Sequence, residues 1–143
     1  MSRTAESLQP EIVIGVTNRT TALSACTRGL IIARATNARV HLVYAIDGRD
    51  PQGESIAHRH AEGLLEALAL SSSVPVTIHV VQAEAHTAIL QVARSTSAEL
   101  IVIGNQGLTK HGRFTRATPA RVLRGATCSV LVVDTSPVPI VRH

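Results

Sequence analysis

Residues 101–126 read IVIGNQGLTKHGRFTRATPARVLRGA and contain the pattern on which the fold class depends. The stretch begins with a continuous apolar run, which is typical of a strand buried on both faces of a parallel sheet. It then passes two glycines, crosses a basic loop and reaches Thr118 and Pro119. Threonine is a good helix cap, and proline costs least at the first helical position. The stretch therefore predicts a strand, a loop and a helix in succession.

The rest of the chain repeats this alternation. Four further runs have the apolar content or the period-two alternation of strands: EIVIGV at residues 11–16, RVHLVYAID at 39–47, VPVTIHVVQ at 74–82 and CSVLVVDT at 128–135. Helical spacing of apolar residues fills the intervals, at residues 22–38, 54–70 and 86–98. The predicted class is α/β: a three-layer α/β/α sandwich with a five-stranded, mainly parallel sheet and right-handed crossovers.

Length and composition indicate a single domain. The chain has 143 residues and is 45% hydrophobic, with so few aromatic residues that Val, Ile, Leu and Ala must form the core. We expect a flexible N-terminal tail over residues 1–10, one domain over 11–136, and a C-terminal tail over 137–143, where two prolines argue against a central strand. No run is long and apolar enough to span a bilayer or to act as a secretory signal, so we expect a cytoplasmic protein without a membrane partner.

The basic charge of the chain leaves its ligand class open. A formal net charge of +4 suggests nucleic-acid binding, in which the basic side chains named at the end of this paragraph would contact the phosphates. Stacking aromatics, which such a surface preferably has, are almost absent, so we do not expect nucleic acid as the partner. A basic surface attracts a phosphorylated small molecule equally well. The basic residues in question are Lys110, Arg113, Arg116, Arg121 and Arg124.

In a parallel sheet of this kind, ligands bind beyond the carboxyl ends of the strands. The loops to consider are therefore those at residues 17–20, 47–54, 83–86 and 105–118. In the last loop, Gly104 and Gly107 let backbone amides approach a ligand, and the following helix start suits an anion. The alternative is that two glycines and a capped helix are ordinary punctuation. The loop lacks the G-x-x-x-x-G-K-[ST] pattern, and no GxGxxG follows the first strand.

The element order together with EIVIGVTNRTT, AELIVIGNQG and RVLRGATCSVLVVD resembles the universal stress protein family, over residues 11–135. The resemblance implies an adenine nucleotide alpha hydrolase-like α/β domain that dimerises. Many members of that family bind ATP or another adenine nucleotide through the signature G-2x-G-9x-G-[ST]. Its glycines and hydroxyl surround the phosphates and ribose.

Gly104 and Gly107 match the first two glycines of that signature, but the closing half departs from it. Aligning the chain on ARVLRGATCSVLVV places Arg116 at the third glycine and Ala117 at the Ser or Thr, with a loop one residue short. An ungapped reading instead places Ala117 and Thr118 there. Both readings lose the glycine. Arg116 either supplies charge to a phosphate or fills the pocket.

Other family positions fall at the ends of the first three strands. The family has Asp just after the first strand, where this chain has Thr17 preceded by Val16. A glycine commonly follows the third strand in a G-x-P setting, where this chain has Ala83 and Ala85. Ala45 matches a small adenine-contacting position. The nucleotide-binding residues implied by the resemblance are Val16, Thr17, Ala45, Ala83, Gly104, Gly107, Arg116, Ala117 and Thr118.

The functional prediction is non-catalytic, regulatory binding of an adenine nucleotide (ATP, AMP or cyclic AMP), with no metal required and with a homodimer formed through residues 129–134 and the proline-containing C-terminal tail. The alternative is a stress protein that has lost nucleotide binding and acts as a dimeric scaffold for protein contacts. No nucleophile motif such as G-x-S-x-G is present, so we expect no catalytic residues and no enzyme. Both interpretations share one fold and one dimer.

The remaining reactive side chains favour structural roles. We expect Cys26 and Cys128 to be core residues, and His41 and His79 to be hydrogen-bonded within strands. A helix face that carries Glu54, His58 and Glu62 has the spacing of a shared ion site, but a solvated face explains it more simply. Glu84 and His86 flank a candidate ligand loop and form the better polar pair.

Overall fold

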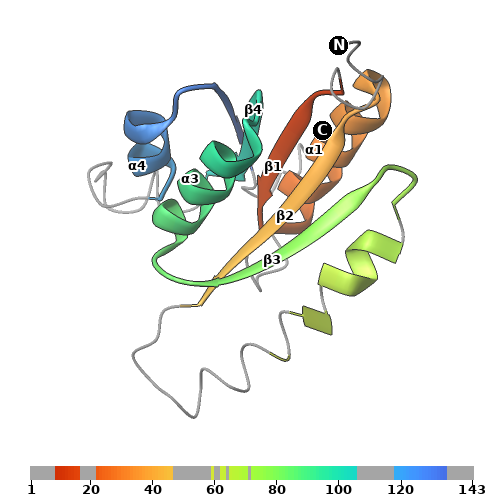
Figure 1. Cartoon of the computed structure of the whole chain (residues 1–143), viewed down its shortest axis with the longest axis horizontal. Coiled ribbons are helices and arrows are strands. Elements are labelled where there is room, and N and C mark those ends of the chain that lie inside the picture. Colours follow the sequence, from red (N-terminus) through yellow and green to blue (C-terminus); the bar gives the residue numbers. More distant parts are fainter. Residues whose placement is uncertain are drawn as a thin grey trace, which may run out of the picture.

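The computed structural model describes residues 9–16, 22–46, 59, 62–63, 65–70, 72–105 and 118–134. Strands and helices alternate along these segments, as Figure 1 shows. A short helical stretch at residues 65–70 lies between β2 and β3. The elements are β1 (Glu11–Gly15), α1 (Ala22–Thr36), β2 (Arg39–Ile46), β3 (Val76–Gln82), α3 (Ala85–Thr96), β4 (Leu100–Gly104), α4 (Thr118–Gly125) and β5 (Ser129–Val133).

All described strand pairs are parallel, and the five strands lie in the order β3-β2-β1-β4-β5. The central strand β1 places Ile12 opposite Val40 of β2 on one side and opposite Leu100 of β4 on the other. β3 and β5 are the two outer strands. The predicted fold class is confirmed, and the sheet is parallel throughout its described part.

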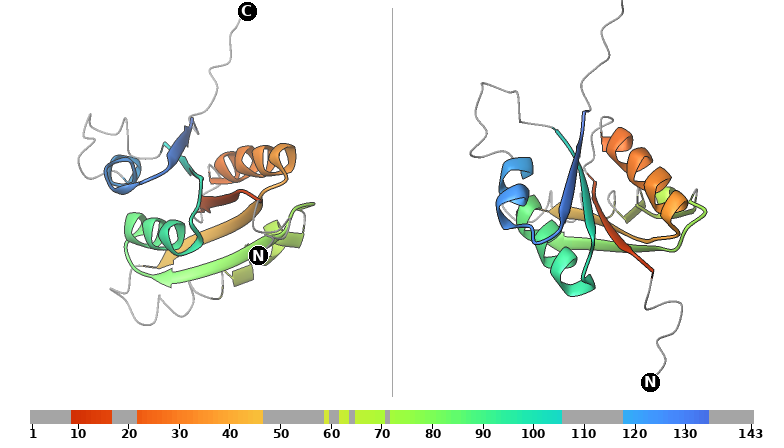
Figure 2. Two further views of the ribbon diagram at one scale, coloured as in Figure 1. Left: turned by 45° about the horizontal axis from the view of Figure 1, so that its top comes forward. Right: turned by 90° about the horizontal axis from the view of Figure 1, so that it is seen from above.

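Helices cover both faces of the sheet (Figure 2). On one face, α1 and the stretch at residues 65–70 enclose a core that includes Ile14, Leu42 and Leu65. On the other face, α3 and α4 pack over a second core that includes Val43 and Ile101. Strand residues alternate between the two cores, because successive side chains point to opposite faces. β1, β2 and β4 are therefore buried on both sides, and this is why β1 and β4 appear as continuous apolar runs in the sequence.

Two glycines let the layers approach closely. A Cβ at Gly29 of α1 would lie 2.5 Å from Cδ1 of Ile14, so this helix rests directly on the central strand. A Cβ at Gly15 would lie 2.8 Å from Cδ1 of Ile89 in α3, on the opposite face. Because real Cβ atoms essentially never make such contacts, a side chain at either position would force the facing isoleucine to shift.

The core is aliphatic, as predicted: Tyr44 is the one aromatic side chain among the buried residues of the described segments. The predicted helix start differs by one position, since α4 begins at Thr118 itself and not at Pro119. α1 begins at Ala22, the first residue of the predicted helical spacing. Residues 1–8 of the predicted N-terminal tail and the whole predicted C-terminal tail, residues 137–143, lie outside the described residues, so the predicted domain limits stay a prediction.

None of the helices in the part of the chain that the structure describes has the length and apolar character that crossing a bilayer requires. The cytoplasmic location expected from the sequence stays a prediction.

Candidate functional site

The strand order has a switch point at β1. The chain runs outward from β1 to β2 and β3, and then α3 carries it back across one face of the sheet to β4, on the other side of β1. The connections after β1 and β4 therefore leave neighbouring strands toward opposite faces of the sheet. In open α/β sheets this divergence creates a crevice beyond the carboxyl ends of the strands, where ligands bind.

Val16, directly after β1, and Ala45, near the end of β2, lie at this edge. The Val16 amide donates a hydrogen bond to the Val43 carbonyl oxygen at 2.8 Å, and its side chain is 5% exposed. Val16 therefore positions the chain that leaves β1. Ala45 is half-buried, pairs with Val81 of β3, and packs against the core on the α3 face. Thr17, which follows Val16, lies outside the described residues.

Gly104 ends β4 opposite Val133 of β5. The next residue, Asn105, donates its backbone amide to the Val133 carbonyl oxygen at 3.0 Å and its side-chain amide to Oδ1 of Asp134 at 3.0 Å. These two bonds hold the start of the β4–α4 connection against β5. Sequence patterns did not identify Asn105, because its partners are 28 and 29 residues away along the chain.

Ala83 follows β3, and its amide donates to the Val81 carbonyl oxygen at 3.1 Å. Beside it, the Glu84 carboxylate accepts Nη1 of Arg121 at 3.0 Å and lies 3.4 Å from Nδ1 of His86. The polar pair expected from the sequence, Glu84 and His86, is thus present, and the structure adds Arg121 from α4. This ion pair joins the α3 start to the first turns of α4.

Thr118 is the first residue of α4, and its position depends on how that helix is anchored. Pro119 and Val122 are buried against the sheet. A Cβ at Gly125 would lie 2.6 Å from Cδ1 of Leu90, so α4 also packs closely on α3. Gly107, Arg116 and Ala117, which the family signature brings to the same edge, lie outside the described residues.

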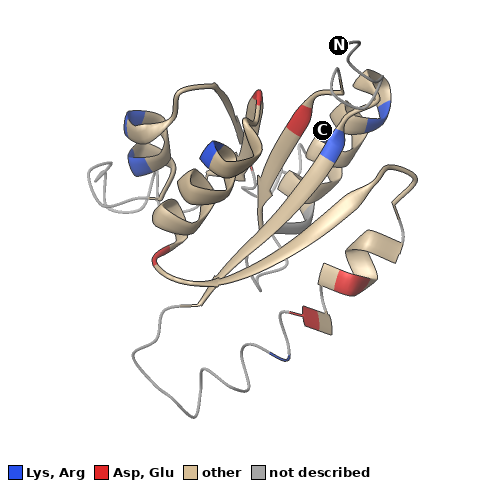
Figure 3. Cartoon of the chain, in the orientation of Figure 1, with Lys and Arg blue, Asp and Glu red and all other residues tan. Residues whose placement is uncertain are grey.

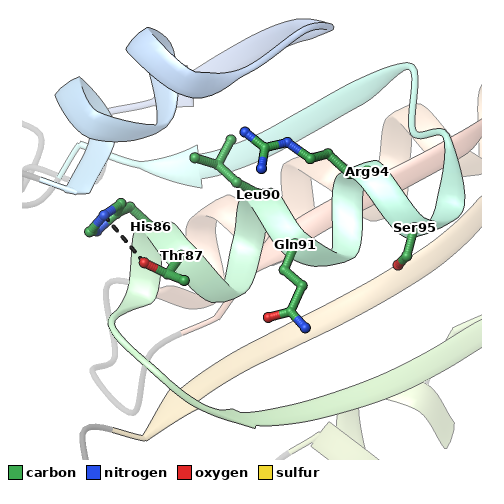
Figure 4. Close-up of a pocket in the computed structure, with 6 residues that line it drawn as sticks. All are labelled: His86, Thr87, Leu90, Gln91, Arg94 and Ser95. Atoms are coloured by element: carbon green, nitrogen blue, oxygen red, sulfur yellow. Dashed lines mark hydrogen bonds between the residues drawn. The ribbon is translucent and has the colours of Figure 1, made fainter.

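A surface pocket of about 710 Å³ lies along the outer side of α3, as Figure 4 shows. The Thr87 hydroxyl lies 3.3 Å from Nε2 of His86 at one end of it. The pocket shares only His86 with the loops selected from the sequence, so the candidate ligand edge and this pocket are distinct. Its lining residues are His86, Thr87, Leu90, Gln91, Arg94 and Ser95.

The thiols lie in opposite cores. Cys26 belongs to α1 and is buried in the core on that face of the sheet, and burial raises the pKa of its thiol to about 11. Cys128 is half-buried in the core on the other face, and burial raises its thiol pKa as well. Both stay protonated near neutral pH, where a nucleophile or metal ligand needs the thiolate. The structural role expected for both cysteines agrees with these surroundings.

Metal-ligating side chains do not converge in the described segments, where no group of three His, Cys, Asp or Glu residues is placed to hold an ion. The helix face proposed as an ion site falls mostly outside those segments. Basic residues are spread over α1, β2, α3 and α4, as the colouring of Figure 3 shows. Of the residues named for a nucleic-acid surface, Arg121 is paired with Glu84 and Arg124 lies in the last turn of α4.

The fold is that of a three-layer α/β protein. Its switch point lies at the carboxyl ends of β1 and β4, where proteins of this class bind ligands. The model of the universal stress protein family matches residues 10–134. A universal stress protein of Methanocaldococcus jannaschii is 30% identical over 145 residues, covering 92% of this chain and 85% of the relative. The chain therefore belongs to the universal stress protein family, as the sequence resemblance predicted.

Solved structures agree with this fold. A universal stress protein in complex with cAMP has a TM-score of 0.75 at 23% identity, covering 89% of this chain and 98% of that chain. The universal stress protein from Archaeoglobus fulgidus in complex with dAMP has a TM-score of 0.66 at 18% identity, covering 87% of this chain and 96% of that chain. At these identities the two structures support the architecture of the chain.

Proposed function

We propose that this universal stress protein binds an adenine nucleotide, without catalysing a reaction on it, at the carboxyl edge of the sheet between β1 and β4. The observation that carries the proposal is the convergence of Val16, Ala45, Ala83 and Gly104 on one edge, at the ends of four different strands. Thr118, at the start of α4, follows the connection that leaves this edge.

The chemistry of this edge suits a planar base and a phosphate better than a metal. The side chains of Ala45 and Ala83, at the ends of β2 and β3, are small, so they do not obstruct a planar ring bound at this edge. Gly104 opens the β4 connection without a Cβ, so backbone amides can approach phosphate oxygens. Thr17, Gly107, Arg116 and Ala117 complete the proposed set. Arg116 would take the place of the missing third glycine and offer a guanidinium to the phosphate.

The two structural neighbours support the adenine base in this proposal, since one is a complex with cAMP and the other with dAMP. Both of those ligands carry a single phosphate. In this chain the closing half of the phosphate loop has an arginine where the family has a glycine. A single phosphate needs fewer backbone donors than a triphosphate, so AMP and cyclic AMP are better matched to the altered loop than ATP.

Isothermal titration calorimetry with AMP, cyclic AMP and ATP tests the proposal. We expect at least one of these nucleotides to bind the unmodified protein saturably. We expect the Arg116→Ala variant to bind that nucleotide with lower affinity. Arg94→Ala is the matched control, because it removes one positive charge from the outer pocket on α3 and not from the edge. Equal affinities for the unmodified protein and Arg116→Ala would refute the phosphate role of Arg116. No heat and no thermal shift at millimolar nucleotide would refute nucleotide binding.

We further propose that two copies of the chain pair through the outer strand β5. Within the described sheet β5 has a neighbour on one side only, and its residues Val130–Val133 are half-buried and apolar. The Val133 carbonyl faces β4, because it accepts the Asn105 amide, so the alternation of a strand turns the backbone groups of Val130 and Val132 to the free edge. An apolar edge with unpaired backbone groups is a template for a second chain.

Leu123 of α4 adds to this surface. It is 52% exposed, and helical geometry places it on the side of α4 away from Gly125 and Arg121, which contact α3. α4 also contacts β5. The exposed leucine therefore extends the apolar strip of the proposed dimer.

Light scattering coupled to size-exclusion chromatography tests the dimer with two substitutions. Val132→Pro removes an amide from the free edge and leaves the hydrogen bonds to β4, so we expect it to yield monomers. The control Val76→Pro, on the opposite outer strand, should remain dimeric if it folds. A monomeric unmodified protein would refute the dimer. A dimer without nucleotide binding would instead favour the scaffold alternative.

A further inference from the structure

A chain of polar side chains crosses three strands in the amino half of the sheet, away from the proposed nucleotide edge. Nε2 of His41 in β2 lies 3.0 Å from Oε2 of Glu11 in β1, and Nδ1 of the same ring lies 3.0 Å from Nε2 of His79 in β3. His41 is 9% exposed and is the one polar residue among the buried side chains of the described segments. Neither the nucleotide site nor the β5 edge uses this chain of contacts.

The two imidazoles are joined by a hydrogen bond. Their centroids are 5.2 Å apart while the facing nitrogens are 3.0 Å apart, so each ring points its nitrogen at the other ring and not at a shared third point. Two histidine ligands of one metal ion would converge on such a point. The geometry therefore favours a shared proton over a shared ion.

Proton counting shows what this arrangement tolerates. A carboxylate only accepts, so His41 donates Nε2–H to Glu11, and a neutral His79 donates Nε2–H to Nδ1 of His41. If the pair gains one proton, both contacts are kept, because the N–H of the one imidazolium ring still points at the lone pair of the neutral ring. Two added protons place an N–H on each of the facing nitrogens, and the contact between β2 and β3 must open.

We propose that the Glu11–His41–His79 chain is an acid-sensitive latch that holds the outer strand β3 against β2. The latch closes when the histidine pair carries one proton or none, and it opens when both rings are protonated. Because β3 is an outer strand, opening does not require the central strands to separate. The proposal does not depend on nucleotide binding.

Charged groups of both signs lie near the pair. The Glu11 carboxylate lies 3.0 Å from Nε2 of His41 and carries the charge opposite to that of a protonated ring. Arg39 is the preceding residue on this face of β2, and its positive charge opposes a second positive charge on the histidine pair. Its Nε donates a hydrogen bond to Oε1 of Gln9. Glu99 lies beside Glu11, donating its backbone amide to the Glu11 carbonyl. The α3 side chains over the strands are apolar, and Arg94 lines the outer pocket.

The pKa of His79 is lowered from its ordinary value of 6.5, first by burial and then by the positive charge of His41. A histidine with a lowered pKa in the closed state binds its proton more tightly when the strand is released. Closure of the latch is therefore fully favoured above the ordinary pKa. It weakens as the pH falls below 6.5, and the loss is complete once the pH passes the lowered value.

Hydrogen exchange of backbone amides between about pH 8 and about pH 5 tests the latch, with the intrinsic pH effect divided out. We expect the protection of β3 amides, relative to those of β4, to fall by about tenfold per pH unit below 6.5 until the lowered pKa is reached. His79→Gln keeps an amide that can face His41 and removes the titrating group, so its β3 protection should not change with pH. His86 lies in α3 and is not one of the three latch residues. We therefore expect His86→Gln to show the same pH dependence of β3 protection as the unmodified protein.

A second measurement on the unmodified protein keeps the test independent of how the variants fold. Nitrogen-15 spectra of the histidine rings should show His79 titrating below the ordinary histidine pKa of 6.5. An equal β3 response in His79→Gln and the unmodified protein would overturn the latch, as would protection that stays constant with pH. Loss of the response on adding EDTA would also overturn it, because the pair would then hold a metal ion.

Discussion

The two ends of the sheet are built from different chemical groups. In the amino half, Glu11, His41 and His79 form a chain of side-chain contacts, each 3.0 Å long, across three strands. At the carboxyl ends, the proposed nucleotide edge consists of backbone groups and of small residues such as Ala45 and Gly104. Because all described strands of the sheet are parallel, titratable side chains gather at one end of it and the proposed nucleotide site lies at the other.

The common core should have the largest effect, because both ends depend on it. Leu42 is 0% exposed and lies in β2 between His41 and the carboxyl end of the strand. We expect Leu42→Ala to lower the free energy of unfolding by about 2–5 kcal/mol, from lost burial and the cavity left behind. Chemical denaturation measures this, and Leu70→Ala, at a position 88% exposed, should change it by less than about 0.5 kcal/mol. Equal losses in the two variants would contradict the burial argument.

His41→Leu should disrupt the side-chain contacts at the amino end of the sheet and leave the carboxyl end unchanged. It leaves Glu11 and His79 without their shared partner, and we expect a loss of about 1–3 kcal/mol in the free energy of unfolding near neutral pH. The pKa of His79 should rise toward its ordinary value, since the charge of His41 is removed. Denaturation and ring NMR measure these two effects. A large change in nucleotide affinity would show that the ends are coupled.

Ala45→Leu should act at the other end. A larger side chain would occupy the space proposed for the adenine ring, so we expect at least about a tenfold loss of nucleotide affinity, or roughly 1.4 kcal/mol. Calorimetry measures the affinity, and hydrogen exchange should show the β3 latch responding to pH as before. Ala35→Leu, on the exposed side of α1, is the size-matched control. Unchanged affinity in Ala45→Leu would place the base elsewhere.

The smallest effect is expected from Glu84→Gln, at the ion pair that joins α3 to α4. The side chains of Arg121 and Glu84 are 36% and 54% exposed, so water and salt screen the contact, and we expect a loss below about 1 kcal/mol that disappears at high salt. Thermal unfolding at low and high salt measures it, with the exposed Glu66→Gln as the control. A loss that persists at high salt would indicate a role beyond this ion pair.

Much of the fold was predictable because its signals are local. The buried strands appear as apolar runs, and Ala88, Ile89, Val92 and Ala93 mark the inner side of α3 at helical spacing. The glycines of the β4 connection and the family motifs identified the carboxyl edge. Helix starts were less certain: α4 begins at Thr118, one residue before the predicted position, because capping residues and first-turn residues are chemically similar.

The contacts between side chains were not predictable in this way. His41 and His79 were expected to form hydrogen bonds within strands, but nothing in the sequence paired them with each other and with Glu11. That pairing depends on the register of three strands, in which His41 lies opposite Val13 and His79 opposite Val43. The Arg121–Glu84 contact likewise requires the packing of α4 on α3.

The amino-acid sequence alone accounts for the α/β class, the aliphatic core, the family and the departure of the phosphate loop from the family signature. Each of these is expressed by residues close together in the chain, where periodicity, turn chemistry and motif spacing operate. The tertiary structure was needed for the strand order, for the switch point at β1 and for the histidine chain. These features join residues about 30 or more positions apart, and only the folded packing of strands and helices sets which of them meet.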